Sequence, residues 1–233
     1  MYADDNQDLL VNLNNVATTT QKPWCYQYAT ATGIANSLPV VPPQGALSSQ
    51  DYIVLLTQQC ISQGALAQYL KNPDVVHCPG DLRYRLPSAG GFTFRSLSAV
   101  TGLNGQAWPA HPTATELLTK RGQLQHPTSK FIFVEENDPR GENWGTWVMG
   151  VQGTAANNWA GTTLVDSPAV FHGSSSTFCW ADGHATSRRW INGATSAYAA
   201  SMNNSKYGSS PSAASTQDDV AFLVSGYPFV GNE

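Results

Sequence analysis

Three side chains with the chemistry of a binding or catalytic site flank one predicted strand. His172 stands before a strand predicted over residues 176–181, and Asp182 and His184 follow it. A histidine beside a carboxylate can hold a transition metal or act as an acid–base pair. The same residues can also serve structure alone, because turn residues of these types hydrogen-bond to loop backbone. We expect His172, Asp182 and His184 to lie at one end of a sheet, as an ion site or as a structural hairpin.

Acidic residues at the end of a second predicted strand offer further ligand atoms. This strand covers residues 130–136 and ends in Glu135 and Glu136, with Asp138 just beyond. Carboxylates and loop carbonyls are the ligands that calcium prefers. A bound metal ion, with calcium as the candidate, is therefore one interpretation of the pattern. Its ligands would come from Glu135, Asp138, His172, Asp182 and His184.

Sequence motifs of the common catalytic sites are absent. The chain has no P-loop, no G-x-G-x-x-G and no H-E-x-x-H. Ser174 follows Gly173, but the second glycine of a nucleophile elbow is missing. Neither a nucleophile nor an oxyanion site accompanies Asp182 and His172, which disfavours an acid–base role for them. We expect that the protein is not an enzyme, and a metal-dependent hydrolase is the least favoured alternative.

The four cysteines leave two interpretations open. Cys25, Cys60, Cys78 and Cys179 form no C-x-x-C and no zinc-finger spacing with histidine, so a structural zinc finger is not expected. Cys60 and Cys78 flank a short helix–strand segment and could pair as a disulfide in an exported protein. The alternative is four free thiols buried as small core residues.

Tryptophans near Gly- and Asn-rich segments could form a ligand-binding face. Trp108, Trp144, Trp147 and Trp159 stand in or beside such segments. Exposed rings of this kind could bind a glycan or another protein. The alternative is that these large apolar side chains fill the core of a loop-rich protein.

The first half of the chain is predicted to be helix and loop. Residues 1–15 resemble the end of a helix without its N-cap, which suggests that an upstream segment is missing. Ser48 and Ser49 can cap a helix over residues 50–62. We also expect short helices over residues 65–70 and 113–119, a strand over residues 75–77 and extended chain over residues 92–100.

The second half is predicted to be mostly antiparallel strand. Residues 130–136, 145–151, 176–181 and 184–190 have strand patterns. Asp182-Gly183 between the last two predicts a hairpin with a two-residue type I′ turn. The order of elements predicts an α+β class, with a sheet packed on an N-terminal helix. Residues 16–233 would form one globular domain, whose part over about 191–217 is polar and rich in loops.

Low charge narrows the function. The chain has 12 basic and 16 acidic residues and a net charge of −4, and charged residues are 12% of the total. Globular proteins average about 25%. A sequence pI of about 5.7 and the lack of basic runs argue against a nucleic-acid partner. A surface of Ser, Thr, Asn, Gln and Gly favours an extracytoplasmic location.

The spacing from His172 to Asp182-Gly183 carries a resemblance to a known family. Nine residues separate the two within FHGSSSTFCWADGHATSRRW, which resembles the signature of the prepilin-type "H-X9-DG" family. Four other segments agree with that family in order, although Leu97 stands where the family usually has Tyr. They are MYADDNQDLL (1–10), ALAQYLKNPDVVHCPGD (65–81), FRSLSAVTGLNG (94–105) and LQHPTSKFIFVEE (124–136).

The resemblance implies a pilin-like fold, in which the end of an N-terminal helix packs on an antiparallel sheet with long irregular loops. It implies a pseudopilin-like structural subunit of a bacterial type II secretion or type IV pilus-like system. Family members anchor in the inner membrane by an apolar N-terminal helix, so this chain resembles the soluble domain alone. Its partners would be other pilin or pseudopilin subunits or proteins of the secretion apparatus. The alternative is a surface-exposed module that binds glycan or protein through its Trp-rich loops.

Overall fold

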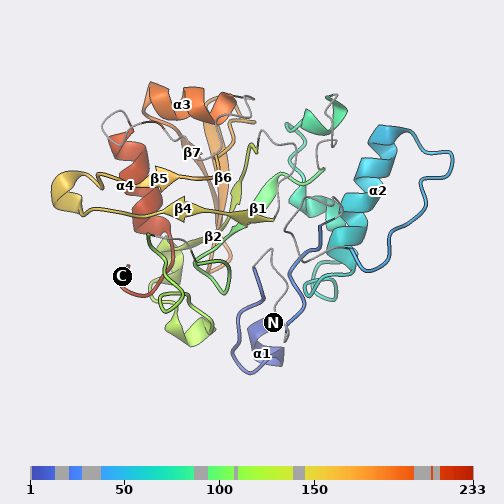
Figure 1. Cartoon of the computed structure of the whole chain (residues 1–233), viewed down its shortest axis with the longest axis horizontal. Helices are drawn as coiled ribbons and strands as arrows, with labels where there is room; N and C mark the ends of the chain where they lie inside the picture. Colours follow the sequence, from blue (N-terminus) through green and yellow to red (C-terminus); the bar gives the residue numbers. More distant parts are fainter. Residues whose placement is uncertain are drawn as a thin grey trace.

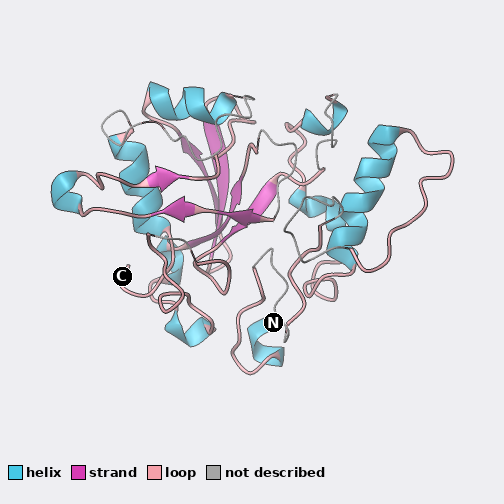
Figure 2. Cartoon of the chain, in the orientation of Figure 1, coloured by secondary structure: helices cyan, strands magenta, loops and turns pink. Residues whose placement is uncertain are grey.

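A computed structural model describes residues 2–13, 21–27, 38–86, 94–107, 110–138, 145–201, 211 and 216–232. The protein is α+β, with a five-stranded sheet in the middle and helices around it (Figure 1, Figure 2). The helices are α1 (Tyr2–Asp5), α2 (Ser49–Ser62), α3 (Gly193–Ala200) and α4 (Gln217–Gly226). The strands are β1 (Leu97–Val100), β2 (Phe131–Glu135), β3 (Thr146–Trp147), β4 (Met149–Gly150), β5 (Thr163–Leu164), β6 (Ser175–Trp180) and β7 (Ala185–Arg189).

The main sheet has the order β3-β1-β2-β6-β7. Every pairing in it is antiparallel except that of β1 with β3, so the sheet is mixed and not antiparallel throughout as expected. The strand predicted over residues 145–151 is interrupted at Val148, whose backbone N–H donates to Asp166 at 2.8 Å. Beyond that point, β4 pairs with β5 in a separate two-stranded sheet.

The hairpin of β6 and β7 confirms the two predicted strands but has a longer turn. Trp180 and His184 close a three-residue loop, because the Trp180 N–H donates to the His184 carbonyl at 2.9 Å. The Gly183 N–H returns to the Trp180 carbonyl at 3.0 Å, and Gly183 has a φ of +99°. Asp182 is not at positive φ, so the type I′ turn, which needs two such residues, does not form.

Helix α4 covers one face of the sheet with its apolar side (Figure 1). Its Leu223 and Val224 are fully buried, and Phe222 lies 5.3 Å from Phe178 of β6 between ring centroids. Tyr227, just beyond α4, is also fully buried. Burial of such side chains is the main favourable contribution to folding, about 1.5–3 kcal/mol each.

Helix α1 differs most from the expectation of an N-terminal helix packed on the sheet. It ends at Asp5 instead of near residue 15, and its contacts are with Tyr69 and Arg121. The Tyr69 hydroxyl donates to Asp5 at 2.7 Å, and the Tyr2 ring packs edge-on against the Tyr69 ring. The sheet is therefore covered by a C-terminal helix.

Most of the remaining expectations on local structure are wrong. Helix α2 is confirmed, with Ser48 as its N-cap. Residues 65–70 and 113–119 form turns instead of helices, and residues 73–76 form a 3-10 helix where a strand was predicted over residues 75–77. Helix α3 begins at Gly193, inside the region expected to be rich in loops.

Among the described residues, no helix is both long and apolar enough to span a bilayer.

Candidate functional site

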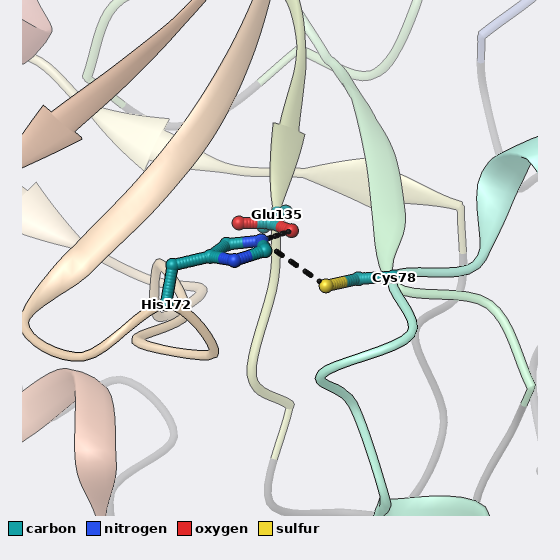
Figure 3. Close-up of side chains that lie close together, drawn as sticks. All are labelled: Cys78, Glu135 and His172. Carbon is teal, nitrogen blue, oxygen red and sulfur yellow. Dashed lines mark hydrogen bonds and ion pairs between the residues drawn. The ribbon is translucent and has the colours of Figure 1, made fainter.

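Three segments that are far apart in sequence meet at one end of β2. Glu135 is the last residue of β2, and β6 runs antiparallel beside it, so the start of β6 lies next to Glu135. His172 precedes β6 and reaches this end of the sheet from the side. Cys78 comes from the loop that follows the 3-10 helix Pro73–Val76. Figure 3 shows the three side chains pointing toward one another.

The imidazole of His172 contacts both other side chains through one nitrogen. Its Nε2 lies 3.0 Å from Oε1 of Glu135 and 3.2 Å from Sγ of Cys78 (Figure 3). One potential ligand atom from each residue lies within 4.8 Å of the other two. Glu135 and Cys78 are buried, whereas the His172 side chain is 45% exposed. The cluster is therefore closed on the protein side and open to solvent beside the imidazole.

Backbone groups fix the two buried members of this cluster. The second oxygen of Glu135, Oε2, accepts a hydrogen bond of 2.7 Å from the Thr177 N–H. The Cys78 N–H donates to the Ser96 hydroxyl at 3.0 Å, and that hydroxyl donates to Asp81 at 2.7 Å. The Glu135 carboxylate and the Cys78 backbone are thus held in place by hydrogen bonds outside the cluster.

A tight backbone approach brings the Cys78 and His172 loops together. A Cβ built on Gly80 would lie 2.9 Å from the Phe171 carbonyl oxygen, so glycine is needed there. The guanidinium of Arg83 also lies over the Phe171 ring, 4.8 Å from its centroid. These contacts position His172 from the same loop that carries Cys78.

The geometry does not match a Cys–His–carboxylate relay. In such a relay the thiol and the carboxylate occupy opposite nitrogens of the imidazole. Here Cys78 and Glu135 share Nε2. Burial, reinforced by the Glu135 carboxylate, also raises the pKa of the Cys78 thiol to about 11, which opposes formation of a nucleophilic thiolate. A thiol, an imidazole and a carboxylate that converge on one point are instead ligands able to hold a metal ion.

The other predicted site residues lie elsewhere. Asp182 and His184 pair with each other at 2.6 Å at the hairpin turn, where the His184 ring stacks on Trp180. The six residues of β6 separate this turn from His172 by about 20 Å, at about 3.3 Å per strand residue. His172, Asp182 and His184 therefore lie at opposite ends of the strand and do not form one ion site.

Asp138 joins a second, separate group. It lies with Glu136 and Asp166, and the three side chains are buried with one ligand atom each within 4.8 Å of the others. An oxygen-only set of this kind matches the preference of calcium in ligand type. The five expected ligands are thus divided among the Cys78 cluster, this acidic group and the hairpin turn.

Among the described residues, the structure shows neither the possible Cys60–Cys78 disulfide nor an exposed face of tryptophans. Cys60 and Cys78 are both free thiols, and Cys60 packs in a small apolar cluster with Leu38 and Leu56. Trp147 is fully buried in the main core, and Trp159 packs against that core while partly buried. Trp108 and Trp144 lie outside the described residues.

Cys78 is the member of the cluster that sequence reasoning did not assign to it. The sequence left Cys78 open between a disulfide with Cys60 and a free buried thiol, and it offered His172 and Glu135 as ligands of a possible metal ion. A signal was present: Cys78 opens a Cys-Pro-Gly turn between predicted elements, and such turns are common places for ligand residues. The pairing of that turn with His172 is non-local and needs the fold.

Comparisons with protein-family models, curated proteins and solved structures found no match for this chain.

Proposed function

We propose that the protein is a structural, pseudopilin-like subunit of a bacterial type II secretion or type IV pilus-like system. The proposal rests on the resemblance to the "H-X9-DG" family and on one observation. The His172 imidazole connects three of the segments that carry the resemblance, because it contacts Cys78 of the second segment and Glu135 of the fourth. Segments that resemble one family in sequence order thus also meet in space.

Contacts among the remaining segments add support. Tyr2 and Asp5 of the first segment contact Tyr69 of the second. Ser96 of the third segment donates a hydrogen bond to Asp81 of the second. The third and fourth segments pair as strands β1 and β2. A structural role for the family-like residues accounts for all of these contacts without requiring catalysis.

Under this proposal the activity of the protein is assembly. Its partners are other pilin or pseudopilin subunits and proteins of the secretion apparatus, and its location is extracytoplasmic. The resemblance implies that an apolar N-terminal helix, processed by a prepilin peptidase, attaches the protein to the inner membrane. The low charge of the chain, 12% of residues, suits a domain displayed on a filament whose surface is neutral and polar.

The test is made in the bacterium that encodes the chain, with an epitope tag at its C-terminus. We expect the tagged protein in the membrane fraction and in filaments sheared from the cells. We also expect deletion of the prepilin peptidase to leave a longer, unprocessed form, detected by mass spectrometry of the intact protein. Complementation with the peptidase gene is the control and should restore the shorter form.

Two results would contradict the proposal together. One is a mature mass that does not change when the peptidase is deleted. The other is recovery of the tagged protein only in soluble fractions, with none in membranes or sheared filaments.

A further inference from the structure

We propose that Cys78, Glu135 and His172 form a binding site for a thiophilic divalent cation of the zinc class. The site has three protein ligands and a fourth position that water fills. This goes beyond assembly and is independent of it, because the argument uses the geometry of the three side chains alone.

The first argument is the convergence of two partners on one ring nitrogen. Nε2 of a neutral imidazole has a single lone pair, in the ring plane, and it binds one proton or one metal ion. Glu135 and Cys78 both lie within 3.2 Å of this nitrogen. One proton on Nε2 can align well with only one of these two atoms, whereas a metal ion placed among Nε2, Oε1 and Sγ can bind all three at once.

The second argument is the spacing of the donor atoms. Zinc binds sulfur at about 2.3 Å and nitrogen or oxygen at about 2.0–2.1 Å, so tetrahedral geometry separates S from N by about 3.6 Å and N from O by about 3.3 Å. The observed separations are 3.2 Å for Sγ to Nε2 and 3.0 Å for Nε2 to Oε1. For these two pairs of donor atoms, an outward movement of about 0.4 Å or less reaches the spacing of a zinc site.

The third argument is the type of donor. Sulfur and imidazole select zinc and other borderline transition metals over calcium and magnesium, which take oxygen. The Glu135 carboxylate supplies negative charge and is buried, at 2% exposure. Cys78 binds as thiolate, and its proton leaves to solvent when the metal enters. With the thiolate and the carboxylate, the two charges of the cation are balanced inside the protein.

Supporting hydrogen bonds prepare two of the ligands for this role. Thr177 holds the distal oxygen of Glu135, and Ser96 holds the backbone of Cys78. Partners of this kind orient metal ligands and raise affinity. The half-exposed His172 ring closes the site last and leaves one side open, as in sites with three protein ligands and a water.

A bound ion would link three segments that are distant in sequence. Cys78, Glu135 and His172 are separated by 37 residues or more, so the ion would act as a cross-link between two loops and the central strand. A ligand that binds only the folded state stabilises it in proportion to the logarithm of its concentration. The expected function of the site is therefore to hold the two loops on the end of the sheet.

The experiment uses the full chain after metal removal with a chelator and addition of a thiol-free reductant. Zinc is titrated by calorimetry, and the expected stoichiometry is one ion per chain. At a free zinc concentration about 100 times Kd, the Tm should rise by about 5 °C or more. Cobalt(II) should give the intense near-ultraviolet band of sulfur-to-metal charge transfer together with visible bands typical of four-coordinate cobalt.

Two variants and a matched control decide the assignment. Cys78→Ser should abolish the charge-transfer band, and His172→Ala should weaken zinc binding by more than the roughly 10–100-fold that loss of an outer-shell partner costs. His184→Ala removes a histidine of similar exposure, 43% against 45%, which also pairs with a carboxylate. This control should bind zinc as the wild type does.

The proposal is overturned if the wild type binds neither ion, or if His172→Ala binds zinc as tightly as the wild type. Cobalt bands without sulfur charge transfer would also overturn it. If Cys78→Ser fails to fold, His172→Ala still decides the matter, because the half-exposed imidazole can be removed without opening the core.

Discussion

Asp81 and Arg83 form a two-point ion pair inside the loop that carries Cys78. Nη2 of Arg83 lies 2.6 Å from Oδ2 of Asp81, and Nε lies 2.8 Å from Oδ1. Their side chains are 1% and 6% exposed. Asp81 also accepts the hydrogen bond from Ser96, whose hydroxyl in turn holds the backbone of Cys78. The ion pair thus maintains the shape of one wall of the candidate site.

Replacement of Asp81 should destabilise the fold strongly. Asp81→Ala leaves the guanidinium of Arg83 buried without its carboxylate, and removal of one partner of a buried pair costs about 3–5 kcal/mol. We expect a loss of this size in the free energy of unfolding in urea. The exposed pair of Arg121 with Asp4 and Asp8 provides the control, because solvent screens such a pair and Arg121→Ala should shift the urea midpoint far less than Asp81→Ala does. Equal losses in the two variants would contradict the prediction.

The hairpin glycine should be sensitive to substitution for a reason of backbone conformation alone. Gly183 has a φ of +99°, and a Cβ built on it meets nothing within 4 Å. Gly183→Val or Gly183→Ala should therefore lower stability by about 1–3 kcal/mol through strain, without a clash. Thermal unfolding followed by circular dichroism measures this loss, and valine should be at least as costly as alanine.

Gly193 is a matched control for the hairpin glycine. A Cβ built on it also meets nothing within 4 Å, but its φ lies outside the positive range. Because Gly193 begins α3, Gly193→Ala should be neutral or slightly stabilising. If Gly183→Ala and Gly193→Ala have the same Tm, the backbone of the turn is not strained by a side chain at position 183.

Local signals in the sequence were enough for part of the fold. The strand pattern of residues 130–136 and the Asp-Gly between two strands identified β2, β6 and β7 correctly. The prediction of a single strand over residues 145–151 is wrong, because the strand is interrupted at Val148 by a hydrogen bond to Asp166, 18 residues away. A contact of this kind is set by tertiary packing and cannot be recognised from a short stretch of sequence.

Only part of the candidate site could be predicted from the sequence, because its residues come from segments that meet only in the fold. The sequence pattern offers Glu135 and His172 as ligands of one ion, and the two side chains contact each other at 3.0 Å. The same pattern also offers His184, but the six residues of β6 carry the chain from His172 to the opposite end of the sheet. Cys78 could not be assigned, because its meeting with His172 depends on the fold of a loop 94 residues away in sequence.

Stability should decrease at alkaline pH more than exposed groups alone would cause. Burial raises the pKa of Tyr227 to about 12 from an ordinary value of 10.0. The folded state therefore holds the phenol proton more tightly than the unfolded chain does. The contribution of the protonated phenol to the free energy of unfolding is complete below pH 10. It is lost as the pH rises from 10 toward 12, by about 1.4 kcal/mol per pH unit. The buried thiols of Cys25 and Cys60, with pKa values of about 11 and 12, act in the same direction from pH 9 upward.

Tyr227→Phe isolates the contribution of the phenol. At neutral pH it should lower stability by about 1–3 kcal/mol, because the Thr101 hydroxyl loses its partner at 2.6 Å. Above pH 10 its urea midpoint should decline less steeply with pH than that of the wild type. Parallel declines in the two proteins between pH 10 and 11 would show that Tyr227 does not ionise on unfolding.

The N-cap of α2 gives a prediction with a control in the next residue. The Ser48 hydroxyl accepts the Asp51 N–H at 3.1 Å and donates to the Asp51 carboxylate at 2.7 Å. Ser48→Ala removes both bonds and should cost about 1 kcal/mol of stability. Ser49 is the first residue of the helix, and Ser49→Ala should change stability by about 0.5 kcal/mol or less. Both variants are compared by urea unfolding at neutral pH. The sequence alone allows either serine to be the N-cap. A larger loss of stability for Ser49→Ala than for Ser48→Ala would therefore identify Ser49 as the N-cap and place the start of α2 one residue later.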